Sequence, residues 1–120
     1  MRRPWLFGAL LLSILLLTLH LLALAHYWYW VYWWFDVMMH LLGGVTLGVF
    51  FVALSRTPRP LLYLVLTAVC FVGWEVIEYV GGISRNEPNF TFDTAHDLLD
   101  DVLGATAVYA LARFSVWRSR

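Results

Sequence analysis

Two carboxylates, Glu75 and Glu78, lie three residues apart inside a hydrophobic run that extends from Leu61 to Val80. Residues three apart share one face of a helix, so these two side chains are expected to lie side by side. An ionised carboxylate near the middle of a membrane helix costs about 2.5 to 3.5 kcal/mol even on a lenient insertion scale. Two of them in one run therefore require partners, and the rest of the chain has to supply them.

Five further acidic residues repeat at helical spacing in two other parts of the chain. Asp36 and His40 are four residues apart and therefore share a helix face. The others follow the three-and-four spacing of a stripe along one helix: Asp93, Asp97, and Asp100 or Asp101. Adjacent residues on a helix point in different directions, so only one of the last two is expected to face the other acids.

Carboxylates that lie together repel one another unless a cation or a shared proton intervenes. Helical bundles that bind paired metal ions use carboxylates from facing helices, with an acid and a histidine one turn apart. We therefore predict a site for one or two divalent cations with these ligands: Asp36, His40, Glu75, Glu78, Asp97 and Asp101. Oxygen-rich ligands with one imidazole suit Mg, Mn, Fe or Zn. Glu75 and Glu78 are also the predicted catalytic groups.

Some of the other polar residues have simpler interpretations. Asp93 or Thr94 could cap a helix, because the residues around Thr94 have the spacing of a capping box. His20 fits a hydrogen bond between helices better than metal binding, and His26 fits a position at the membrane interface. For His96 the sequence leaves a ligand and a surface residue equally open.

The composition indicates an integral membrane protein. Apolar residues make up 62% of the 120 residues and charged residues only 13%, which would leave a soluble protein with more apolar surface than it could bury. The formal net charge is zero, which excludes nucleic-acid binding through a general positive field. Cys70, the single cysteine, cannot form an intrachain disulfide and is predicted to be a small buried apolar residue.

Four hydrophobic runs are long enough to cross a bilayer, which takes about 20 residues. We predict helices at residues 5–25, 37–54, 61–80 and 93–113, joined by short loops. Small residues at 23–25 resemble a signal-peptide cleavage site, but the first run is long for a signal peptide and is predicted to be retained. The expected fold is one all-α domain, residues 1–120, forming an antiparallel four-transmembrane-helix bundle.

Two further patterns concern the membrane surface and neighbouring helices. Residues 27–35 contain eight aromatic residues, which predicts an interfacial belt and a turn between the first two helices. A stacking platform for a flat cofactor is the alternative for this segment. Gly44 and Gly48 have the spacing that lets two membrane helices approach closely. They are predicted contacts for a second copy of the chain or for a partner in a membrane complex.

The arginines predict an orientation in the membrane. All eight basic residues are arginines, and seven lie near the two termini or in the loop between the second and third hydrophobic runs. Only Arg85 lies in another loop. Because positive residues concentrate on the cytoplasmic side, we expect cytoplasmic N and C termini and acidic residues in the outer half of the bundle. The expected location is the plasma membrane of a bacterium or archaeon, as a multi-pass protein.

Three blocks of sequence together resemble the small VanZ-like and YjdF-like membrane proteins of bacteria and archaea. They are Asp36-Val-Met-Met-His40-Leu-Leu-Gly-Gly, Gly73-Trp-Glu75-Val-Ile-Glu78, and Asp93-Thr-Ala-His-Asp97-Leu-Leu-Asp-Asp101-Val-Leu-Gly-Ala. The resemblance covers about the last two-thirds of the chain. It implies a polytopic membrane protein connected with the cell envelope, since the VanZ name is attached to teicoplanin resistance. Met38 departs from the basic residue that members often have near this position, which makes the site more acidic.

Three functions agree with these patterns. The first is a metal-dependent hydrolase or transferase that acts on a membrane lipid or a lipid-linked phosphate, with the metal polarising a phosphoryl oxygen or activating water. The second is ion or proton transport, because acidic residues within membranes also mark permeation pathways. The third is a small subunit or assembly factor of a membrane complex, which would dock through Gly44, Gly48 and the aromatic belt.

Overall fold

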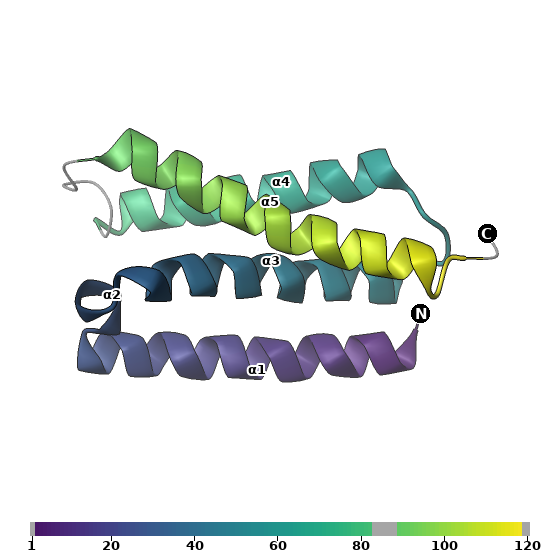
Figure 1. Cartoon of the computed structure of the whole chain (residues 1–120), viewed down its shortest axis with the longest axis horizontal. Helices are drawn as coiled ribbons and strands as arrows, with labels where there is room; N and C mark the ends of the chain where they lie inside the picture. Colours follow the sequence, from purple (N-terminus) through teal and green to yellow (C-terminus); the bar gives the residue numbers. More distant parts are fainter. Residues whose placement is uncertain (1, 83–88, 119–120) are drawn as a thin grey trace.

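The computed structural model describes residues 2–82 and 89–118, and over these residues it contains helices and turns but no strand. The predicted all-α fold is therefore confirmed. Four helices are long and one is a single turn (Figure 1). Their bounds are α1 (Arg3–His26), α2 (Trp28–Val31), α3 (Trp33–Leu54), α4 (Pro60–Val80) and α5 (Phe90–Phe114).

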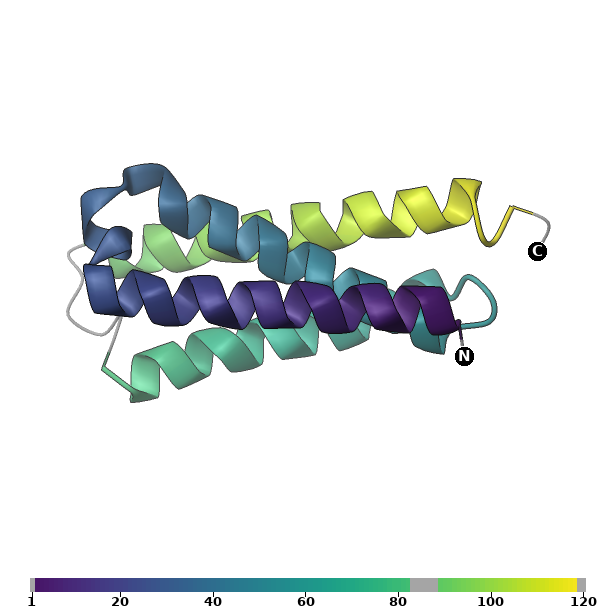
Figure 2. The same cartoon turned by 90° about the horizontal axis from the view of Figure 1, so that it is seen from below.

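The four long helices lie roughly antiparallel along an axis about 48 Å long (Figures 1 and 2). Both chain ends lie at the same end of the molecule as the loop between α3 and α4. Helix α3 is central, because it packs most extensively against α5 and next most against α1. Helix α4 makes smaller contacts with α5 and α3, and within the described residues its backbone does not contact α1. Helices α1 and α4 therefore both pack on α3, without contact between their own backbones.

Helices α1, α3 and α4 are each long and apolar enough to cross a membrane. Most of the large apolar side chains of α1 and α4 face outward, among them Phe7, Ile14, Leu61 and Val69, each more than 60% exposed. Helix α5 has comparable length but carries four aspartates in its first half. This outward apolar surface is what a lipid environment accepts and water does not.

The helices begin somewhat earlier than their apolar runs predict. Helix α3 begins at Trp33, so that Asp36 lies in its first turn. Helix α5 begins at Phe90 after Asn89, which places Asp93 in its first turn without any side-chain cap. The capping interpretation of Asp93 and Thr94 is therefore wrong. A helix can continue past its apolar run where the polar surroundings hydrate its side chains, so hydrophobicity alone marks its ends poorly.

Several residues of the predicted loops and tail lie outside the described part of the chain: Arg85, Glu87 and Arg120.

The aromatic segment is helical for most of its length. It forms α2 and the first turn of α3, joined through Tyr32. Tyr27, which joins α1 to α2, has a left-handed backbone with φ of 58°, and it is the one non-glycine residue with positive φ in the described part. Trp30 and Trp33 face outward, as an interfacial belt requires, whereas Phe35 is buried in the bundle. The segment therefore has an outward face and an inward face.

At the end that carries both termini, Arg2 connects three segments. Its backbone N–H donates to the carbonyl of Ala53, and its guanidinium donates to the carbonyls of Ser55, Arg56 and Val116. The Ala53 carbonyl lies in the last turn of α3, and the other three lie just past the ends of α3 and α5, where backbone carbonyls lack helical partners. The neighbouring Trp117 is buried against the two helices. Arg2 thus ties the chain start to the ends of both helices.

Glycine determines how closely α3 and α5 approach. A Cβ atom on Gly44 would collide with the backbone carbonyl of Asp101, and one on Gly104 would collide with the carbonyl of Leu41. A Cβ on Gly48 would lie 2.5 Å from the Tyr63 hydroxyl and 3.0 Å from Val108. The close approach that Gly44 and Gly48 permit is therefore with helices of the same chain.

Alanine at Gly44 is expected to lower the free energy of unfolding by about 1 to 3 kcal/mol, because the added methyl group meets backbone atoms that cannot rotate away. Gly73 is the matched control, since a Cβ there meets nothing within 4 Å. Gly73→Ala should leave stability unchanged or raise it by about 0.5 to 1 kcal/mol, because alanine favours helix. Unfolding of each variant in detergent measures both changes. Equal stability of Gly44→Ala and the parent protein would contradict the packing described here.

Candidate metal centre

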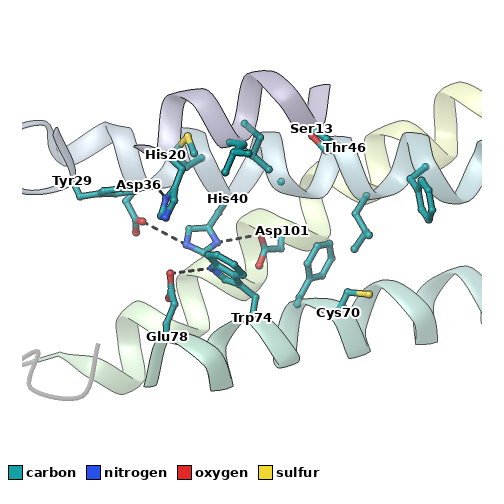
Figure 3. A pocket seen from close by; sticks show the side chains of 17 residues that line it. Ser13, His20, Tyr29, Asp36, His40, Thr46, Cys70, Trp74, Glu78 and Asp101 are labelled. Carbon is teal, nitrogen blue, oxygen red and sulfur yellow. Dashed lines mark hydrogen bonds and ion pairs between the residues drawn. The ribbon is translucent and has the colours of Figure 1, made fainter. Parts of the chain in front are cut away.

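His40 lies among three carboxylates where α3 packs against α5. Its Nε2 atom is 3.5 Å from Asp36 Oδ1 and 3.4 Å from Asp97 Oδ2. Its Nδ1 atom is 3.1 Å from Asp101 Oδ1. His40, Asp97 and Asp101 are buried, and Asp36 is half-buried (Figure 3 shows His40 between Asp36 and Asp101). Both ring nitrogens therefore face acidic oxygen atoms.

Helical spacing places these four side chains opposite one another. Asp36 and His40 lie one turn apart on α3, and Asp97 and Asp101 lie one turn apart on α5. One turn further along each helix, Gly44 of α3 meets the backbone of Asp101 and Gly104 of α5 meets that of Leu41. The glycines bring the two backbones close, and the short distance between backbones brings the polar side chains into contact.

Helix α4 supplies the two remaining carboxylates. Glu75 is only 8% exposed, and its Oε1 atom is buried without a hydrogen-bond partner. Glu78 is half-buried and accepts a hydrogen bond of 3.0 Å from the indole N–H of Trp74. Asp101 resembles Glu75 in that its second oxygen, Oδ2, is buried and unpartnered. Both of these oxygens thus lie in the interior without a hydrogen-bond partner, which is costly for acidic groups.

All six predicted ligands come together in the structure, and they are called the acid cluster below. Three groups of three side chains offer ligand atoms that all lie within 4.8 Å of one another: Asp36, His40 and Asp97; His40, Glu75 and Asp101; and Glu75, Glu78 and Asp97. A fourth group of the same size is His96, Asp97 and Asp100, in which His96 Nδ1 lies 2.9 Å from Asp100 Oδ2. Asp97 belongs to three of these groups. Asp100 and Asp101 do face different partners, as their adjacency predicts.

The arrangement around His40 fits two chemical states. In one, both ring nitrogens carry protons and the imidazolium donates to carboxylates on either side. In the other, Asp101 accepts the Nδ1 proton and leaves Nε2 free to bind a metal ion beside Asp36 and Asp97. A metal-bound histidine usually donates its other ring N–H in this way. The unpartnered oxygens of Glu75 and Asp101 favour a further cation, because one imidazolium leaves both of them unsatisfied.

A cavity of about 420 Å³ borders the acid cluster between α1, α3 and α4. Asp36, His40, Glu78 and Asp101 line it together with aromatic side chains that the sequence did not connect with the site. His20 Nδ1 lies 2.7 Å from the Tyr29 hydroxyl, so the predicted hydrogen bond of His20 is present. The ring of His20 also lies edge-on to that of Trp74, with 6.2 Å between the ring centres.

Tyr29 enters the site from the aromatic segment. Its burial, and then the nearby charges of Asp36 and Glu78, raise the pKa of its phenol above the usual value. The hydroxyl therefore keeps its proton and remains a donor. No signal in the sequence separates Tyr29 from the other aromatic residues between positions 27 and 35, because inward-facing and outward-facing side chains there are of the same types.

Cys70 also lines the cavity and is exposed, so the prediction that it is buried is wrong.

No family model, characterised protein or solved structure matches this chain. The resemblance to the VanZ-like and YjdF-like proteins therefore stays a prediction.

Removing the imidazole should destabilise the bundle, because three carboxylates would then face one another without a cation between them. We expect His40→Gln to lower the free energy of unfolding by about 3 to 5 kcal/mol, the usual cost of removing one partner of a buried ion pair. Replacing Asp97 by Asn in the same background should recover part of this loss, with a coupling of about 0.5 to 3 kcal/mol.

A double-mutant cycle followed by unfolding in detergent measures this coupling. His26→Gln is the control, since His26 is exposed at the end of α1. Purely additive effects of His40→Gln and Asp97→Asn would show that the two side chains do not interact.

Proposed function

We propose that this protein is a membrane-embedded, metal-dependent enzyme, a hydrolase or transferase acting on a lipid or lipid-linked phosphate. The observation that carries the proposal is the pair of buried, unpartnered oxygens on Glu75 and Asp101, next to a histidine already surrounded by carboxylates. An acidic interior of this kind needs a cation or shared protons to relieve its repulsion, and we propose a cation, for which oxygen ligands with one imidazole suit Mg, Mn, Fe or Zn.

Each residue of the acid cluster has a distinct place in this proposal. Asp36, Asp97 and His40 Nε2 would hold the metal, with Glu75 and Glu78 approaching from α4. Asp101 would act as a positioning residue, because its Oδ1 faces His40 Nδ1 and so holds the imidazole in the orientation that presents Nε2. A bound divalent ion supplies charge stabilisation at a phosphoryl oxygen and lowers the pKa of water. A carboxylate of α4 that is not a ligand would serve as the general base.

The proposal includes a topology. Helix α5 is taken as the fourth membrane span, since it packs against the central helix α3 more extensively than any other helix does. Its aspartates then face the interior of the bundle instead of the lipid, as charged residues in spans usually do. The arginines near both termini and at 55–60 favour a cytoplasmic location for that end of the molecule. The acid cluster would then lie in the outer half of a bacterial or archaeal plasma membrane.

Transport and docking agree less well with the arrangement of residues. A permeation pathway needs polar groups across the whole membrane, yet α3 after His40 and α5 after Asp101 contain no further acidic residue. Docking through Gly44 and Gly48 would need an exposed glycine face, whereas both glycines are buried against other helices of the chain. A second copy or a complex partner would have to use another surface.

Metal binding is the direct test of the proposal. Protein purified in detergent and equilibrated with Mg²⁺, Mn²⁺, Fe²⁺ or Zn²⁺ should retain at least one of these ions in elemental analysis. Glu75→Gln and Asp97→Asn should each weaken binding by about tenfold or more, because each removes a charged ligand. Asp93→Asn is the matched control, since Asp93 lies on the same helix but in none of the four groups.

Metal-free protein under all four conditions would contradict the proposal and would leave the doubly protonated His40 as the only cation of the cluster. Equal losses of metal in Asp93→Asn and Asp97→Asn would likewise contradict the assignment of ligands.

A further inference from the structure

The cavity beside the acid cluster has two chemically different parts. One part is polar and contains Asp36, His40 and Glu78 with the Tyr29 hydroxyl (Figure 3). The other part, called the apolar arm, continues toward the end of the molecule that carries the termini. Its apolar lining is Leu16, Leu17, Leu47, Phe50 and Phe71. A cavity with one polar and one apolar part matches an amphiphilic molecule.

The few hydroxyl groups in the apolar arm are already satisfied. Ser13 donates to the carbonyl of Ala9 at 2.8 Å, and Thr46 donates to the carbonyl of Leu42 at 2.7 Å. Neither hydroxyl needs a polar ligand, so the arm as a whole is suited to hydrocarbon. A volume of about 420 Å³ lies within the usual range for small-molecule sites.

The arm reaches the lipid-facing surface between α1 and α4. Both helices lie on α3, but within the described residues their backbones do not contact each other. Leu17 of α1 lines the cavity while 59% exposed, and Cys70 of α4 also lines it while exposed. Because α1 and α4 are both long and apolar enough to span a membrane, this opening would face bilayer hydrocarbon in a membrane. A lipid chain could therefore enter from the side without crossing water.

The cavity is long and narrow. Its lining extends along α3 from Asp36 to Phe50, a distance of about 20 Å at the usual rise of a helix. A volume of about 420 Å³ spread over this length accommodates one hydrocarbon chain beside α3 but is too narrow for two chains side by side.

We infer that the substrate is an amphiphile with one hydrocarbon chain in the apolar arm and its phosphate at the acid cluster, and that it enters sideways from the bilayer between α1 and α4. The position of the phosphate rests on the proposed function, because acidic side chains hold a phosphate only through a cation. The position of the chain does not depend on the metal.

Gly43 offers a way to block the arm without disturbing the fold. It lines the cavity between the turns that carry His40 and Leu47, and a Cβ there has only Asp101 Oδ1 within 4 Å, at 3.9 Å. A leucine side chain at this position would extend into the cavity. Gly73→Leu is the matched control, because Gly73 is also a helical glycine with free space and does not line the cavity.

The test uses two single-chain probes with a photoreactive diazirine in the middle of the chain, hexadecyl phosphate and hexadecanol, with the full protein in lipid nanodiscs. Mass spectrometry of the crosslinked peptides should place both probes on the apolar arm, at Leu17, Leu47 or Phe50. Gly43→Leu should reduce this labelling by about tenfold, as expected for overpacking of a site, and Gly73→Leu should not. Elemental analysis of Gly43→Leu should show unchanged metal content.

Each outcome bears on one of the two proposals. Labelling spread over outward residues such as Ile14 and Val69, or equal labelling in Gly43→Leu and the parent protein, would overturn the chain site. Hexadecyl phosphate should label more strongly with metal than with EDTA, whereas hexadecanol should not respond. Labelling of the arm by both probes without any response to metal would keep the chain site and contradict the metal-held phosphate.

Discussion

The close contact between α3 and α5 at Gly44 and Gly104 is the constraint on which the rest of the site depends. Any side chain at these positions would meet the backbone of the facing helix. One turn away, the same short distance between backbones brings His40 within 3.1 to 3.4 Å of Asp101 and Asp97. A wider separation would relieve the packing and would also separate the imidazole from its carboxylates. Helix packing and site electrostatics are therefore one property of this pair of helices.

Helix α4 has a different relation to the site. It packs less extensively on α3 and α5 than these two pack on each other, and it carries Glu75, whose buried Oε1 atom has no hydrogen-bond partner. Its separation from α1 also creates the opening of the cavity. Acidic groups in a membrane interior are expensive, and no packing benefit of Glu75 or Glu78 offsets that cost. Their burial next to Asp97 and Asp101 is understandable if a cation holds them together.

Much of this arrangement could be predicted from the sequence, because helical periodicity determines which residues share a face. The spacing of Asp36 with His40, of Glu75 with Glu78 and of Asp97 with Asp101 was sufficient to bring six residues to one place. Periodicity does not say which helix a face meets. Gly44 and Gly48 have a spacing that suits a second copy or a partner as well as a helix of the same chain, and in the structure they pack against helices of the same chain. Periodicity also does not give the orientation of a ring, so the sequence does not predict that Asp101 lies at Nδ1 of His40, on the side of the ring away from Nε2.

The aromatic segment shows the same limit. Belt residues and site residues have the same composition there, and only the turn through α2 directs Tyr29 inward to His20. Cys70 was expected to be buried because cysteine usually is, but it lies at an opening between helices that no local pattern specifies.

The central claim, that His40 binds a divalent cation through Nε2 among the carboxylates, is tested most directly by electron spin echo spectroscopy of the Mn²⁺-loaded protein. A nitrogen nucleus coupled to manganese is predicted, and this signal should disappear in His40→Gln and persist in His96→Gln. Manganese with only water and oxygen ligands, or a nitrogen signal that survives in His40→Gln, would contradict the claim.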